Sequence, residues 1–193
     1  MRQAVVVLLV LAGLMAAPAA AQSPSFIKDS ANDGKGPLDV VRVALGPRTD
    51  GRLRGEITME KAWTTADLRA GGGPSGSICL QLWVVRVPGN EPPDYLVCAT
   101  PAPTGDELRG RVLRDRSNGL PRQVGAAIVT RPTARTVYLR FAQPTIDRPT
   151  EVRFAGEAVT RAAKCPRPLG CRDTAPDAPA TRNLTLRSPS ASG

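Results

Sequence analysis

Two apolar runs that each contain one cysteine constrain the fold of this chain more than any other feature. SICLQLWVV (77–85) and PDYLVCAT (93–100) flank the turn-rich segment VPGNEPP, which is typical of a β-hairpin with a long tip. If Cys79 lies opposite Cys98, alternate positions of both runs form one apolar face. That face consists of Ile78, Leu80, Leu82, Val84, Tyr95 and Val97. The hydrophobic pattern therefore predicts a cross-strand disulfide on the opposite face of the hairpin.

The N-terminus has the organisation of a secretory signal peptide. Arg2 precedes an apolar stretch at 4–15, and Ala19 and Ala21 provide an Ala-x-Ala exit. We therefore expect cleavage near Ala21 and a secreted, extracellular or cell-surface protein that begins at Gln22. Because no later segment is apolar over about 18 residues, we expect no transmembrane segment in the mature chain.

The cysteines indicate disulfide bonds and not a metal site. An even number of cysteines in an exported chain predicts two disulfides, with three connectivities possible on paper. Cys165 and Cys171 flank the short segment PRPLG, and we expect them to close a tight ring. Zinc would require close cysteine pairs or histidines, and the chain contains no histidine.

Turn residues and period-2 alternation divide the remaining chain into short strands. In RLRGEITME, Leu53, Ile57 and Met59 face one side while charged residues face the other, as in a half-buried antiparallel strand. Further candidate strands lie at 40–46, 107–114, 123–130, 136–143, 151–159 and 183–187. We predict an all-β fold, a single antiparallel β-sandwich of about 8–9 strands with a disulfide-closed C-terminal loop.

The same pattern predicts the domain organisation. The expected segments are a signal peptide (1–21), an N-terminal acidic segment (22–38), a β-sandwich body (39–160), a disulfide-stapled C-terminal segment with a last strand (161–187) and a disordered tail (188–193).

The net charge of +9 derives mostly from arginine. The arginines are spread one or two at a time and often alternate with apolar residues, as on the solvated face of a strand. We therefore expect no nucleic-acid partner, although a weak and salt-dependent attraction to anionic cell-surface polymers remains physically reasonable.

The absence of histidine excludes the usual Ser-His-Asp and Cys-His catalytic devices. Paired carboxylates can support glycoside hydrolysis, but no spacing in this sequence marks such a pair. We therefore expect a protein without enzymatic activity.

One stretch near the mature N-terminus, DSANDGKGPLD, is rich in oxygen donors. Compared with an EF-hand loop, it has acidic residues at the first and fifth positions (Asp29, Asp33) and glycine at the sixth (Gly34). The third and twelfth positions are Ala31 and Val40, which offer no side-chain oxygen. The stretch is not an EF-hand, but irregular oxygen-rich loops also bind calcium.

A second acidic element, DTAPD, lies near the other end of the chain. Because the termini of a domain are often close together, we expect Asp29, Asp33 and Asp39 to share one calcium ion with Asp173 or Asp177. The alternative is that the aspartates and glycines only form Asx-turns and begin a strand.

The order D…D-G-x-G-P-L-D, a β-rich body and then D-x-A-P-D resembles secreted bacterial β-sandwich modules. These are the DOMON-like group and the family-nine carbohydrate-binding modules, including the C-terminal module of glucodextranase-type enzymes. The resemblance spans roughly residues 29–186 and implies a calcium-stabilised sandwich with a sugar-binding or structural role. It also implies an ion held by the five aspartates named above.

Carbohydrate-binding members of that group stack sugars on aromatic side chains, and two tryptophans are candidates here. The hairpin register places Trp83 on the outer face beside the disulfide, where it is either a sugar platform or covered by another segment. Trp63 follows a strand and is the better candidate for an exposed aromatic.

The ring CPRPLGC allows a second interpretation, in which Arg167 is presented to a secreted protease by a rigid loop. The alternative is a staple for an irregular C-terminal segment. The expected partners are therefore an extracellular polysaccharide or a secreted protein.

Overall fold

The structure is a computed structural model that describes residues 22–34, 38–69, 75–84, 92–116, 119–160, 165, 170–177 and 180–186. The predicted signal peptide, Arg167 and the predicted disordered tail at 188–193 lie outside the described residues.

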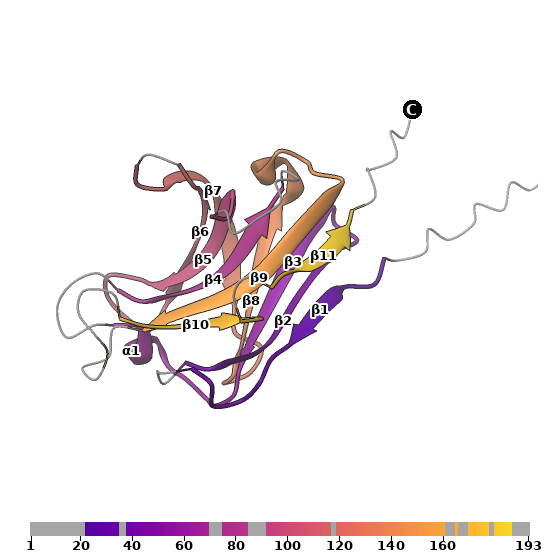
Figure 1. The fold of residues 1–193 in the computed structure, drawn as a ribbon. Helices are drawn as coiled ribbons and strands as arrows, with labels where there is room; N and C mark the ends of the chain where they lie inside the picture. Colours follow the sequence, from indigo (N-terminus) through magenta and orange to yellow (C-terminus); the bar gives the residue numbers. More distant parts are fainter. Residues whose placement is uncertain are drawn as a thin grey trace, which may run out of the picture.

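The described chain is almost entirely antiparallel β-structure (Figure 1). The strands are β1 (Ser25–Lys28), β2 (Val40–Pro47), β3 (Arg52–Met59), β4 (Ser77–Trp83), β5 (Tyr95–Pro101), β6 (Leu108–Arg114), β7 (Arg122–Thr130), β8 (Thr136–Ala142), β9 (Glu151–Thr160), β10 (Cys171–Ala175) and β11 (Arg182–Thr185). A single helical turn, α1 (Thr65–Leu68), follows β3, and a 3-10 turn, η1 (Gln143–Ile146), follows β8. The predicted all-β class is confirmed.

The 11 strands form one nearly closed sheet in the order β1-β2-β3-β8-β7-β6-β5-β4-β9-β10, with β11 also paired to β9. Strand β7 connects two facing layers, because its residues up to Ala127 pair with β6 and those from Ile128 pair with β8. The two ends of the sheet approach each other, since β2 contacts both β9 and β10 (Figure 1). The result is a sandwich-like fold whose first and last strands lie close together.

The central hairpin has the predicted register. Cys79 pairs with Cys98 and Gln81 with Leu96, and the disulfide between the cysteines is present. Five of the six residues of the predicted apolar face are fully buried and Val84 is partly buried. The second predicted disulfide, Cys165–Cys171, is also present.

Two glycines allow the facing layers to pack closely. A Cβ atom on Gly55 of β3 would lie 2.9 Å from Cδ2 of Leu80 in β4. A Cβ atom on Gly156 of β9 would lie 2.4 Å from Cγ2 of Val43 in β2. Since real Cβ atoms do not approach other atoms so closely, both positions depend on glycine.

The structure has more strands than the sequence predicted. The additional strands are β1, within the predicted N-terminal acidic segment, and β10, which precedes the one strand predicted in the disulfide-stapled C-terminal segment. Both are short strands at the ends of the sheet. No helix in the part of the chain that the structure describes has the length and apolar character needed to cross a membrane.

Candidate metal site

Five aspartates gather where the two ends of the sheet meet. Asp29 directly follows β1, Asp33 lies in the β1–β2 connection, and Asp39 directly precedes β2. Asp173 lies within β10, and Asp177 follows that strand. These are the five residues that the sequence analysis proposed as ligands, and the structure brings them together from both ends of the chain.

The carboxylates form two overlapping groups that share Asp33. One oxygen each from Asp29, Asp33 and Asp177 lie within 4.8 Å of one another, and the same holds for Asp33, Asp39 and Asp173. Calcium binds oxygen at about 2.3–2.6 Å, so two ligands on opposite sides of one ion are about 5 Å apart. The spacing of the oxygens in either group is therefore compatible with a bound metal ion.

The second group is the more buried of the two. Asp39 is 6% exposed and Asp173 is 8% exposed, whereas Asp33 is exposed. The backbone N–H of Val40 donates to Oδ2 of Asp173 at 2.6 Å, and the N–H of Asn32 donates to Oδ2 of Asp39. The first bond connects β2 to β10, the second closes the β1–β2 connection on itself, and together they orient both carboxylates.

Two carboxylate oxygens in the cluster are buried without a hydrogen-bond partner in the described structure. They are Oδ1 of Asp39 and Oδ2 of Asp29. A buried oxygen without a partner is unfavourable, because its hydrogen bonds to water are lost and no protein donor replaces them. Among the described residues, none of the five carboxylates forms an ion pair with lysine or arginine.

The surroundings of the cluster disfavour the ionised form of its carboxylates. The pKa of Asp173 is raised to about 6 from an ordinary 3.8, mainly by burial and in smaller part by the carboxylates of Asp39, Asp33 and Asp29, against the hydrogen bond from Val40. Burial also raises the pKa of Asp39 and of Asp29, and the neighbouring Asp33 adds to both shifts. A bound cation would reverse this balance, because it favours the ionised carboxylates.

The backbone of the β1–β2 connection passes very close to the carboxylates. Asn32 has a φ of 67°, in the left-handed region that asparagine tolerates better than most residues. A Cβ atom on Gly34 would lie 2.9 Å from both Cγ and Oδ1 of Asp173. Glycine is therefore required for the loop to pass directly over that carboxylate.

Glu60 also belongs to this region, and the sequence analysis did not place it there. Its carboxylate accepts a hydrogen bond from Nδ2 of Asn32 at 3.1 Å, and its backbone N–H donates to the carbonyl of Asp39 at 2.7 Å. The only signal in the sequence is its position directly after β3, which pairs with β2.

The expectation that Trp63 is an exposed aromatic is wrong. Trp63 is 3% exposed, its indole N–H donates to the carbonyl of Arg135 at 3.2 Å, and the guanidinium of Arg131 lies 3.9 Å from its ring centroid. The β7–β8 connection covers it. Trp83 is half-buried, with Arg153 at 5.8 Å from its ring centroid, so its role as a sugar platform stays a prediction.

Comparisons with known proteins found no relative of this chain. No protein-family model, no curated protein and no solved structure matches it.

Proposed function

We propose that this chain is an exported, non-catalytic module whose two sheet ends are held together by calcium bound in the aspartate cluster. The observation that carries the proposal is the pair of buried oxygens without partners, on Asp39 and Asp29, inside a group of five carboxylates. Such oxygens need a hydrogen-bond donor or a cation, and among the described residues no donor reaches them and no lysine or arginine pairs with these carboxylates.

Calcium fits this set of ligands better than other common metals. All five side chains offer hard oxygen donors, and calcium accepts six to eight oxygens in flexible geometry, including carbonyls and water. Magnesium requires a small octahedral site, and zinc prefers nitrogen and sulfur. The loop lacks the EF-hand pattern, but the flexible coordination of calcium tolerates such an irregular arrangement of ligands.

The position of the cluster explains what the ion would do for the fold. Strands β1 and β10 are the two ends of the strand order, and each contributes or adjoins ligands. One ion would therefore link the first and last parts of the sheet across the contact between β2 and β10. This link acts beside a disulfide that holds the start of β10, since Cys171 bonds Cys165.

Sequence and bonding support the non-catalytic and exported parts of the proposal. The chain has no histidine, and all four of its cysteines form disulfides. Disulfides are typical of oxidising compartments outside the cytoplasm, in agreement with the predicted signal peptide.

A thermal melt of the oxidised protein tests the proposal. Calcium at a hundredfold excess over its dissociation constant should stabilise the folded state by about 2.7 kcal/mol. For a chain of this size, that corresponds to a melting temperature about 5–11 °C higher than in chelator.

The double variant Asp33→Asn with Asp177→Asn should lose this response to calcium. Asp115→Asn, which lies outside both carboxylate groups, should keep it. Equal melting temperatures in calcium and chelator for the wild-type protein would refute the proposed site.

A further inference from the structure

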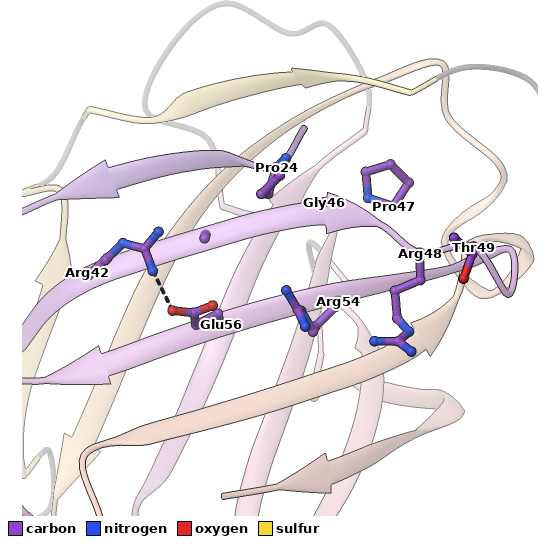
Figure 2. A pocket seen from close by; sticks show the side chains of 9 residues that line it. Pro24, Arg42, Gly46, Pro47, Arg48, Thr49, Arg54 and Glu56 are labelled. Atoms are coloured by element: carbon purple, nitrogen blue, oxygen red, sulfur yellow. Dashed lines mark hydrogen bonds and ion pairs between the residues drawn. The ribbon is translucent and has the colours of Figure 1, made fainter. Parts of the chain in front are cut away.

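The outer face of β2 and β3 carries a basic groove that the calcium site does not use. Residues Leu53 and Ile57 of β3 point into the core, so Arg54 and Glu56 point outward. The groove has a volume of about 250 Å³ and includes Arg42, Arg48 and Arg54 in its lining. Figure 2 shows these side chains along one face, with Arg42 directed at Glu56.

Carboxylates neutralise only part of this face. Arg42 forms an ion pair with Glu56, and Nε of Arg48 lies 3.4 Å from Asp50. Arg54 forms no ion pair with any described residue, and the same is true of Arg140 in the neighbouring strand β8.

Arg54 and Arg140 stand directly opposite each other in the β3–β8 pairing. Like charges in directly opposed positions destabilise a sheet. Opposed Cα atoms in antiparallel strands are about 4.5–5.5 Å apart, and both side chains leave the same face of the sheet, so two long arginine side chains can reach toward one oxyanion. Such an anion would convert the repulsion into two charge-assisted interactions.

Two further contacts indicate a prepared site. Nε of Arg140 is buried without a hydrogen-bond partner in the described structure. The guanidinium of Arg54 lies 4.8 Å from the ring centroid of Tyr138, a contact that restrains its orientation. A restrained guanidinium opposite a second arginine suits oxyanion recognition, and the buried Nε shows that the Arg140 guanidinium is not saturated by protein acceptors.

We propose that this face of β2, β3 and β8 binds an acidic polysaccharide, with one carboxylate or sulfate group held between Arg54 and Arg140. Arg54 also lines the groove together with Arg48 and Arg42, which allows contacts with successive acidic groups of a chain. On the β1 side of the groove, Phe26 is 49% exposed, and the centroid of its ring lies 5.4 Å from the guanidinium carbon of Arg42. This ring offers an apolar surface to a sugar ring. The disulfides favour a compartment in which acidic polysaccharides are abundant polyanions.

The sequence did not reveal this site, because alternating arginines are also typical of a solvated strand. Arg54 and Arg140 are far apart in the chain and meet only through the β3–β8 pairing.

Calorimetry with chondroitin sulfate, which carries both carboxylate and sulfate groups, tests the proposal at physiological salt and with excess calcium. The double variant Arg54→Gln with Arg140→Gln should bind at least about tenfold more weakly than the wild type, since two charge-assisted bonds are lost. Glu56→Gln should bind more tightly, because it removes a carboxylate that competes for Arg42. Wild-type melting curves for both variants would show that they fold.

The matched control is Arg109→Gln with Arg111→Gln, which removes the same charge from a groove next to β6 in the other layer. This variant should bind nearly as well as the wild type. An equal loss in both double variants would overturn the proposal, because binding would then follow net charge alone.

Three comparison ligands separate the other sources of an oxyanion. Dextran, which is uncharged, should not bind. Polyglutamate binding as tightly as chondroitin sulfate would identify an acidic protein as the partner and overturn the proposal. Binding of inorganic sulfate alone, without any gain from the polymer, would also overturn it.

Discussion

Replacing Asp173 by asparagine should have opposite effects on stability with and without calcium. Asparagine has the same shape as aspartate, and its side-chain oxygen can still accept the hydrogen bond from Val40, which measures 2.6 Å in the native chain. The substitution removes one negative charge from a cluster that repels it. In chelator, Asp173→Asn should therefore be more stable than the wild type, whereas in calcium it loses a ligand.

The size of the effect follows from the pKa of this carboxyl group. Its pKa is about 6 in the folded chain against an ordinary 3.8, so the folded state binds the proton more tightly than the unfolded state. At neutral pH the ionised group then lowers stability, by at most about 3 kcal/mol, because one pKa unit corresponds to about 1.36 kcal/mol. Screening by nearby solvent reduces this to about 1–2 kcal/mol.

Thermal melts of both proteins in chelator and in calcium would measure the effect. The variant should melt about 2–8 °C above the wild type in chelator, and calcium should raise the melting temperature of the wild type but barely change that of the variant. Asp115→Asn serves as the control for loss of a charge elsewhere. A variant that melts below the wild type in both solutions would show that the cluster is not under electrostatic strain.

Three further predictions concern the rest of the fold. Leu82→Ala should lower the free energy of unfolding by about 2–5 kcal/mol in a urea titration, because Leu82 is fully buried between the layers; a loss below about 1 kcal/mol would contradict its place in the core. Replacing Cys79 and Cys98 together by serine should lower the free energy of unfolding by about 3 kcal/mol in the same assay. An unchanged unfolding curve would show that this disulfide does not stabilise the fold. Tyr95 donates to Asp147 at 2.6 Å and burial raises its pKa to about 12 from 10.0, so the folded state holds this proton more tightly and stability should fall as the pH rises from 10 to 12. An absorbance titration of the folded protein should show a late phenolate that Tyr95→Phe removes, and the absence of that late phase from the wild type would exclude this assignment.

The strands of the body could be predicted because apolar residues recur at alternate positions in runs bounded by turn residues. In β3, each expected apolar position is buried, and in the β4–β5 hairpin the disulfide and the apolar face specify the same register. The short terminal strands lack this signal. In β1 only Ile27 is buried, and one apolar position cannot define a period. Such strands form because β2 and β9 offer them unpaired edges.

Only part of the candidate sites could be predicted, because local sequence does not show which distant segments come together. The aspartates could be grouped because the termini of a domain tend to meet, and DTAPD is a recognisable acidic element. The burial of Trp63 depends on the backbone and arginines of the β7–β8 connection, about which local sequence says nothing. The facing of Arg54 and Arg140 likewise depends on long-range strand pairing.

A crystal structure of the mature protein grown with calcium, with anomalous diffraction data, would show whether calcium joins the two ends of the sheet. We expect an anomalous peak about 2.3–2.6 Å from carboxylate oxygens of Asp33, Asp39 and Asp173, the distance expected for calcium. We also expect Oδ1 of Asp39 to be one of the ligands. A well-ordered cluster at the same calcium concentration, without any such peak and with these oxygens bonded only to protein or water, would contradict the proposed site.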